Sequence, residues 1–484
     1  MSFVSFAFLI LFLPTVLLLY FYMRKKEKHV AAKAVLAVSS AFFYAFYGLQ
    51  PFVILCAVLI ADWGITIVLR KTQDNKTKKL LLASGILLNV LLLMYFKYTG
   101  FFADNIAALL GRPKMSGFDR IIAPAGISYY TFSQIAWLAD SYKGETVKYG
   151  FIDYAVSVLF FPKIGMGPIM LHGELLPQLD DKKKFKPDTK AIGRGLIFLA
   201  VGLAKKTILE PLFAGPADFG FDSGTVSMLS VSEAWLCSVA YTIQLYLDFS
   251  GYCDMAYGMS QMFNIELVKN FDMPYKAVSI SDFWKRWHIS LTGFLRKYIY
   301  FPLGGSRKGN LKTCLNILII FTISGLWHGA DWSFILWGAL HGLIMVFERL
   351  AGERLTKIPV LIRRAVTLFI VNAGWVLFRS GSVSGALVMF KRMFVPAPGT
   401  SVFALSPQFY ASFDMDSLYF VSAHLNIAVF PPFAAVLFVT AFVKKDIYDM
   451  ELKPGKLMAV LTALLLAFSV FATGNVTPFI YSGF

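Results

Sequence analysis

Apolar runs long enough to cross a bilayer recur along most of the chain. Examples are residues 3–23, 53–69, 80–95 and 457–472, and a membrane-spanning helix needs about 20 mostly apolar residues. The runs are continuous and do not alternate with a period of two, so helices rather than barrel strands must satisfy the backbone in lipid. The sequence therefore predicts an all-α polytopic membrane protein with roughly 10–13 transmembrane or re-entrant helices.

The net charge of +17 is concentrated in short segments between the apolar runs. The positive-inside rule explains this pattern, so the expected partner is the lipid bilayer and no nucleic acid is expected. All the basic clusters can lie on the cytoplasmic side if both termini are extracytoplasmic: residues 24–33, 70–79, 182–190, 269–312, 349–364 and 444–456. The first apolar run precedes its basic residues, which predicts a retained span of a cytoplasmic (inner) membrane protein.

No fixed-period repeat or long linker divides the chain, so residues 1–484 are expected to form a single membrane domain. Prolines and glycines interrupt the apolar stretch 121–178, which predicts half-length helices around a central cavity. The basic, aromatic segment 264–312 predicts short, partly interfacial helices on the cytoplasmic face. The four cysteines show no CxxC spacing, and we interpret them as small core residues.

His328 is the histidine whose surroundings point most clearly to chemistry. It follows a long apolar run, and an ionisable residue at membrane depth is costly and by default functional. A neutral imidazole there can act as a general base. Its neighbours Ser324, Trp327 and Asp331 are candidate binding residues. Alternatively, Ser324 bonds its own helix and Asp331 caps the next one. No two histidines are three or four residues apart, so no metal site is expected.

A second candidate catalytic residue, His288, lies in the basic, aromatic segment. The candidate binding residues around it are Asp282, Trp284, Arg286 and Trp287. A guanidinium suits the phosphates of a nucleotide-bearing donor. As a helix, residues 310–327 would cover about 27 Å, close to one bilayer core. We therefore expect the two histidines at different depths, joined by a tunnel, with His328 nearer the outside.

Several motifs between residues 120 and 342 occur in the order found in a known enzyme family. They are Pro124–Phe132, Phe161–Ile169, Gln244–Tyr252, Asp282–Leu291, Pro302–Gly309 and Trp327–Gly329. In these motifs the chain resembles the membrane-bound O-acyltransferase superfamily, in the branch of the alginate O-acetylation membrane subunit and the peptidoglycan O-acetyltransferase. Residues 365–484, which match less specifically, would add further C-terminal helices.

The resemblance implies a helical cup with a thin centre and funnels from both faces. It also implies that His328 is the catalytic histidine and His288 its second polar residue. An acetyl group would come from a cytoplasmic donor, with acetyl-CoA expected and no permanently bound cofactor. It would cross the membrane for O-acetylation of a cell-surface or exported polysaccharide. An extracytoplasmic SGNH or esterase-like transferase would be the partner.

Two other functions stay open. D-alanyl transfer to teichoic acid from a carrier protein would use the same histidines, although the helices after Arg364 favour the acetyl branch. A transporter or flippase belongs to a different class, and His328→Ala would then disturb transport only. A lipid acyltransferase is less expected, because the sequence shows no lateral opening for a fatty chain.

Overall fold

The computed structural model describes residues 1–113, 121–413, 446–450, 455–472 and 479–480. In these residues the regular structure is helical, apart from one isolated antiparallel bridge between Phe271 and Trp287. The predicted all-α class is therefore confirmed.

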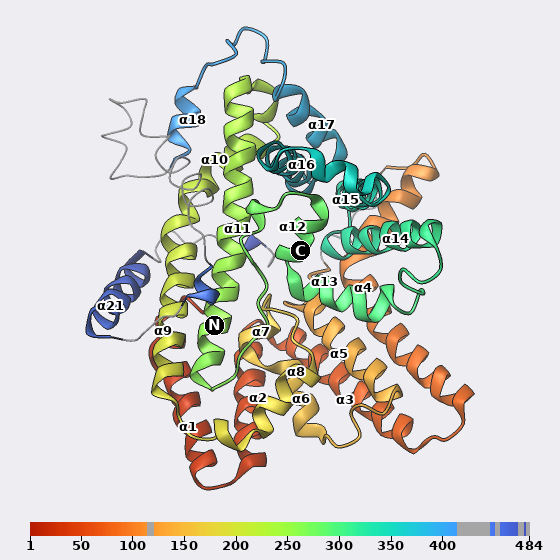
Figure 1. Ribbon diagram of the computed structural model, residues 1–484, viewed down its shortest axis with the longest axis vertical. Coiled ribbons are helices and arrows are strands. Elements are labelled where there is room, and N and C mark those ends of the chain that lie inside the picture. Colours follow the sequence, from red (N-terminus) through yellow and green to blue (C-terminus); the bar gives the residue numbers. More distant parts are fainter. Residues whose placement is uncertain (114–120, 414–445, 451–454, 473–478, 481–484) are drawn as a thin grey trace.

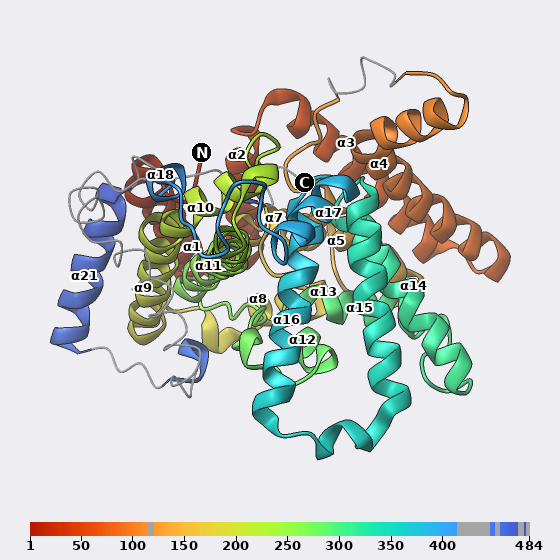
Figure 2. The ribbon, with the colours of Figure 1, turned by 90° about the horizontal axis from the view of Figure 1, so that it is seen from above.

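Six segments among the described residues are long and apolar enough to cross a membrane. They are Ala7–Lys25 (η1, Ala7–Phe12, with α1, Leu13–Lys25), α3 (Leu49–Lys71), α4 (Asn75–Leu109), α14 (Asn310–His328), Trp332–Lys357 (α15, Trp332–Ala351, with η8, Gly352–Lys357) and α16 (Val360–Arg379). Two shorter apolar helices are α2 (His29–Ala45) and α21 (Lys456–Phe471). Figure 2 shows α15 and α16 side by side as a hairpin that projects from the molecule. The chain is thus a multi-pass membrane protein.

The centre of the molecule is α11 (Val231–Met262), a 32-residue helix that is buried along most of its length. It packs against α9 (Thr189–Ala204, continued by η4, Lys205–Leu209) and α10 (Pro211–Phe221). Its polar residues pair inside the protein: Lys206 Nζ lies 2.6 Å from Asp248 Oδ1. Because these charges face protein rather than lipid, α11 is central without being uniformly apolar.

The interrupted stretch 121–178 forms the half-length helices that its prolines and glycines predict. These are α5 (Ile127–Tyr142), α6 (Phe151–Leu159), α7 (Phe161–Ile164) and α8 (His172–Asp180). Gly126, with φ 68°, precedes α5 in the left-handed region. A Cβ there would lie 2.4 Å from the carbonyl oxygen of Ile164, so the two backbones touch at this position.

The basic, aromatic segment 264–312 also forms short helices, as expected. They are η6 (Pro274–Lys276), α12 (Ile280–Arg286), α13 (Ile289–Leu295) and η7 (Arg296–Tyr300). The expected interfacial position is wrong for most of the aromatic side chains, because Phe283, Trp284 and Trp287 are buried. They pack against Trp337 of α15 and Trp375 of α16, so the segment re-enters the protein.

The remaining described helices are short or lie toward the C-terminus. They are η3 (Lys182–Lys184), η5 (Val226–Met228), α17 (Val383–Arg392), α18 (Pro407–Ala411) and η9 (Ile447–Asp449). In Figure 1, α21 lies beside α9, on the opposite side of the molecule from α14 and α15.

Candidate functional site

The two candidate catalytic histidines lie next to each other inside the protein. His328 is the last residue of α14 and His288 immediately precedes α13, and their side chains are almost completely buried. Their ring centroids are 6.4 Å apart. The expectation that they lie at different depths is therefore wrong. The reason is that α12 and α13 re-enter the protein and bring His288 to the end of α14.

Asn270 holds the imidazole of His288 in one tautomer. The Asn270 side-chain oxygen lies 3.2 Å from His288 Nδ1, and it also accepts hydrogen bonds from the backbone N and Oγ of Ser290. A carboxamide oxygen only accepts, so Nδ1 carries the proton and Nε2 keeps its lone pair. Among the described residues, Nε2 has no hydrogen-bond partner. This nitrogen is therefore suited to accept a hydrogen bond from a substrate.

The backbone around His288 is also specifically held. His288 has φ 46° and ψ 51°, in the left-handed region that few non-glycine residues adopt. The backbone N of Ile289 donates to the carbonyl of Asn270 (3.0 Å), and the backbone N of Asp272 donates to the carbonyl of Arg286 (2.9 Å). These two bonds flank the isolated bridge and place Asn270 opposite His288. Unusual backbone conformations of this kind cluster at functional sites.

Aromatic rings surround His328. Its ring centroid lies 4.8 Å from Trp327, 5.0 Å from Trp337 and 5.3 Å from Phe378. The glycines of α14 and α15 make this packing possible, because a Cβ at Gly325 would lie 2.3 Å from the carbonyl oxygen of Phe334. Gly325, three residues before His328, therefore allows the backbone of α15 to approach closely, so that α15 lies next to the histidine.

Of the other candidate residues, Trp327 lies at the histidine pair, with its ring 6.1 Å from that of His288. Ser324 is buried in α14, one turn before His328. Asp331 instead caps α15, where its side chain accepts a hydrogen bond from the backbone N of Ser333 (2.7 Å). The capping alternative for Asp331 is therefore the one that the structure supports.

The candidate residues near His288 divide into packing residues and an ion pair. Trp284 donates from Nε1 to His341 Nδ1 (3.3 Å), and Trp287 packs against Trp375 with ring centroids 4.9 Å apart. Arg286 donates from Nε to Asp282 Oδ1 (2.9 Å). The side chains of Arg286 and Asp282 are partly exposed, so this pair lies at the edge of the site.

A small cavity of about 10 Å³ lies beside the histidine pair and has room for about one water molecule. Its lining residues are Tyr129, Tyr130, Ser133, Val158, Lys163, Ile164, Gly167, Pro168 and Ile169. Ile169 donates its backbone N–H to Ser290 Oγ (2.9 Å), and the Tyr129 ring lies 5.4 Å from that of Trp327. Neither histidine lines this cavity, but its walls contact Ser290, which shares the Asn270 side chain with His288, and Trp327, the chain neighbour of His328.

A column of aromatic rings leads from the histidine pair to a charged cluster. Trp327 stacks on Phe132 (5.2 Å), Phe132 on Phe294 (4.1 Å), and Phe294 contacts Tyr298 (5.0 Å). The hydroxyl of Tyr298 donates to Asp140 Oδ2 (2.6 Å). The column therefore connects the buried site to partly exposed polar residues.

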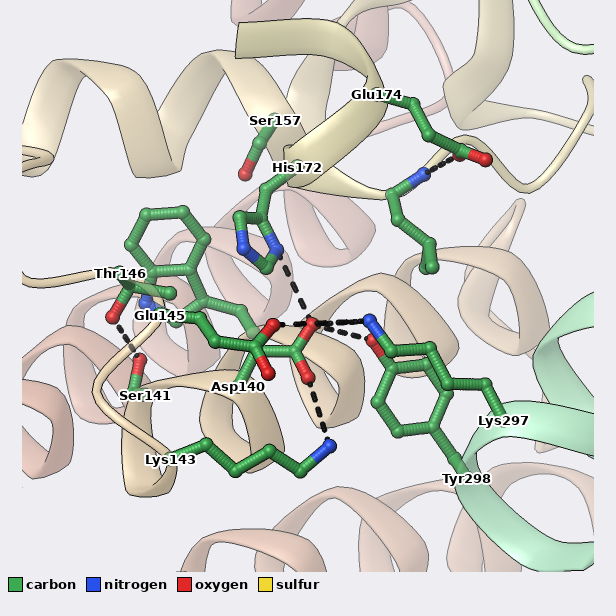
Figure 3. Close-up of polar contacts among 12 residues, drawn as sticks. Asp140, Ser141, Lys143, Glu145, Thr146, Ser157, His172, Glu174, Lys297 and Tyr298 are labelled. Carbon is green, nitrogen blue, oxygen red and sulfur yellow. Dashed lines mark hydrogen bonds and ion pairs between the residues drawn. The ribbon is translucent and has the colours of Figure 1, made fainter. Parts of the chain in front are cut away.

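Figure 3 shows that Asp140 is the centre of this charged cluster. Lys297 Nζ lies 3.0 Å from Asp140 Oδ2, and His172 Nδ1 lies 3.8 Å from the same oxygen. Burial lowers the pKa of His172, which the neighbouring Asp140 carboxylate partly opposes. Asp140, Glu145 and His172 bring potential metal-ligating atoms within 4.8 Å of one another. However, the ammonium of Lys297 already balances the negative charge of Asp140.

The model of the membrane-bound O-acyltransferase family matches residues 39–387 of the chain. The chain belongs to this family. The resemblance predicted from the motifs is thus confirmed, and the protein is a membrane-embedded acyltransferase that requires an acyl donor.

This acyltransferase is similar to enzymes that modify cell-surface polymers. It is 38% identical to the peptidoglycan O-acetyltransferase of Helicobacter pylori, over 83% of this chain and 81% of that protein. It is 33% identical to a probable alginate O-acetylase of Pseudomonas aeruginosa, over 81% of this chain and 75% of that protein. The teichoic acid D-alanyltransferase of Bacillus subtilis is 27% identical, over 46% of this chain and 58% of that protein.

The sequence predicted the two histidines as candidate catalytic residues but missed the residues that contact them. Asn270 is eighteen positions before His288, and no motif links the two. The cavity residues Tyr129 and Ile169 lie in motifs that were recognised, but only the fold brings them to the histidines. Lys97 of α4, which contacts the backbone at His328, had no local signal at all.

Proposed function

We propose that this acyltransferase moves an acetyl group from a cytoplasmic donor, acetyl-CoA, across the membrane for O-acetylation of a cell-surface or exported polysaccharide. The observation that carries this proposal is the pair of buried histidines, 6.4 Å apart at the meeting point of α13 and α14. The two relatives that align over most of this chain carry the names of a peptidoglycan O-acetyltransferase and a probable alginate O-acetylase.

In the proposed reaction His328 is the general base. It takes the proton of the acceptor hydroxyl as the hydroxyl oxygen bonds to the carbonyl carbon of the acetyl thioester. The carbon–sulfur bond then breaks, and the sulfur leaves with that proton as a free thiol. His288 offers a second acceptor, Nε2, for another O–H or N–H group of the substrates, because Asn270 keeps the proton on Nδ1.

The surrounding residues have supporting roles in this proposal. Trp284 and Trp287 pack against α15 and α16 and so hold the segment that carries His288, and the Trp327 ring contacts both histidines. Arg286, at the partly exposed edge, would bind the phosphates of the donor, and Asp282 would hold its guanidinium in place through the ion pair. Asp331 fixes the start of α15 next to His328 by capping it, and Ser324 lies buried one turn before His328.

The proposed topology follows from the charge pattern. The basic clusters lie in the cytoplasm of an inner-membrane protein, and both termini are extracytoplasmic. The donor then enters from the side of the basic segment 264–312. We propose that a separate extracytoplasmic SGNH or esterase-like transferase receives the acetyl group and passes it to the polysaccharide.

The second candidate is D-alanyl transfer to teichoic acid from a carrier protein. The teichoic acid D-alanyltransferase that supports this candidate aligns with 46% of this chain, whereas the peptidoglycan O-acetyltransferase aligns with 83%. This difference in coverage favours acetyl transfer. A transporter without chemistry is the alternative from a different class. It would leave the exported polymer without new esters.

The test is chemical analysis of surface polymers from cells with and without the gene. Mild base releases ester-linked groups, and mass spectrometry identifies them as acetate or D-alanine. The proposal predicts that acetate depends on the gene and D-alanine does not. D-alanine that depends on the gene supports the second candidate. Unchanged esters together with altered polymer export support a transporter.

A further inference from the structure

The backbone end of α14 is held by two side chains from α4. The last four carbonyls of a helix have no partner inside that helix. In α14 the carbonyl of Gly325 accepts from the backbone N of Gly329 (3.3 Å), and that of Leu326 accepts from the Tyr98 hydroxyl. The carbonyls of Trp327 and His328 both accept from Lys97 Nζ, the latter at 3.0 Å.

This helix end differs from the common type, in which a left-handed glycine turns the chain back to satisfy the carbonyls. Gly329 is extended, with φ −164°. The chain therefore leaves α14 without covering its last two carbonyls, and Lys97 supplies the missing donors. An ammonium at this position also stabilises the negative end of the helix dipole.

Lys97 contacts residues of the site, and among the described residues it bonds to no carboxylate. Both of its hydrogen bonds go to backbone oxygens of Trp327 and His328. Its Nζ also lies 5.8 Å from the centroid of the Trp327 ring. A lysine in a membrane-spanning helix is costly and is retained where it has a function. Its described contacts are concentrated on the last turn of α14, which carries the general base.

We propose that Lys97 is a positioning residue for acyl transfer. By fixing the backbone of Trp327 and His328, it fixes the direction in which the His328 imidazole points. It touches no reacting atom. The inference rests on the proposed function, because it assigns a role only if His328 acts in the reaction. A displacement of about 1 Å in a catalytic group can cost about a hundredfold in rate.

The test compares four variants in cells fed isotope-labelled acetate. The measurement is the initial rate of ester incorporation into surface polymer, divided by the amount of folded enzyme from fluorescence-detected size exclusion. Lys97→Met removes the donors, and Lys97→Arg keeps a cation with several donors. Tyr98→Phe removes the neighbouring bond to the Leu326 carbonyl and is the matched control. His328→Ala reports on the proposed function itself.

Lys97→Met is expected to lower the rate per folded enzyme by about tenfold to a hundredfold. Lys97→Arg should restore most of the rate, and Tyr98→Phe should lose much less. If Lys97→Met does not fold, Lys97→Ala, which also removes the donors, gives the same comparison against Lys97→Arg, with Ala the slower. Two results would overturn the inference. The first is a normal rate in whichever neutral Lys97 variant folds. The second is a loss of rate in Lys97→Arg as large as the loss in that neutral variant.

The His328→Ala variant distinguishes a failure of the positioning role of Lys97 from a failure of the proposed function. If His328→Ala loses activity while the neutral Lys97 variant keeps it, only the positioning role is wrong. If His328→Ala keeps full activity, the proposed function is wrong, and the role of Lys97 fails with it.

Discussion

At the scale of single residues, the His288 imidazole depends on a partner that the sequence does not reveal. Asn270 Oδ1 accepts from Nδ1 of His288 and from two groups of Ser290. The sequence predicted both histidines, because an ionisable residue among apolar runs is conspicuous and their motifs are recognisable. It did not predict Asn270, because asparagine in a polar segment is unremarkable until the fold places it opposite the ring.

Asn270→Ala is therefore expected to lower activity more than Asn270→Asp. Alanine leaves buried donors of His288 and Ser290 unpaired, and a lost hydrogen bond of about 1–3 kcal/mol corresponds to about 5-fold to 160-fold in rate. Aspartate still accepts from Nδ1 and keeps the tautomer. Steady-state ester incorporation per folded enzyme measures the difference. Equal losses in both variants would mean that the tautomer of His288 does not matter.

At the scale of elements, the contact between α14 and α15 decides where His328 sits. A Cβ at Gly338 of α15 would lie 2.2 Å from the carbonyl oxygen of Phe321 in α14. Of these two helices, the sequence predicted one over residues 310–327, which corresponds to α14. Their closeness was only hinted at by the glycines on either side of Trp327, since a glycine shows where a close approach is possible but not which backbone will make it.

Gly338→Val should destabilise the protein by about 1–3 kcal/mol, because the added side chain forces α14 and α15 apart. Gly64→Val in α3 is the matched control, since no described atom lies within 4 Å of a Cβ at that position. Thermal unfolding of both purified variants in the same detergent measures the effect. The account of the contact fails if the two variants unfold at the same temperature.

The burial of α12 and α13 inside the protein was the part of the fold that could not be predicted from the sequence. A basic, aromatic segment between apolar runs has the same composition whether its rings lie at the membrane surface or inside the protein. Here Trp284 and Trp287 find partners on α15 and α16, which come much later in the chain. Long-range packing of this kind has no local pattern.

At the scale of the whole molecule, charge predicts orientation and helix packing predicts where the site lies. In the proposed topology the basic clusters lie on the cytoplasmic side, as the positive-inside rule predicts, and the 35-residue helix α4 starts beside one of them and is long enough to reach the other side of a bilayer. The histidine pair lies where short helices meet the end of α14, and in the proposed function a donor from one side and an acceptor from the other would meet there.

Cysteine labelling in intact cells tests this orientation. Lys308→Cys lies in the exposed basic segment before α14, which the proposed topology places in the cytoplasm, and Arg112→Cys lies just beyond the far end of α4. A membrane-impermeant maleimide should label Arg112→Cys in intact cells and Lys308→Cys only after permeabilisation. The unaltered chain gives the background from its own four cysteines. The opposite labelling pattern would reverse the proposed topology.

The central claim is that His328 performs acyl transfer, and the most direct measurement is ester content of the surface polymer in a His328→Ala strain. His172→Gln, which changes another buried histidine outside the pair, is the control. We expect ester incorporation per folded enzyme to fall by about 10²–10⁴-fold in His328→Ala, with polymer export unchanged, because a general base contributes about that much. The control should keep most of its activity. Wild-type ester content in a folded His328→Ala enzyme would contradict the account.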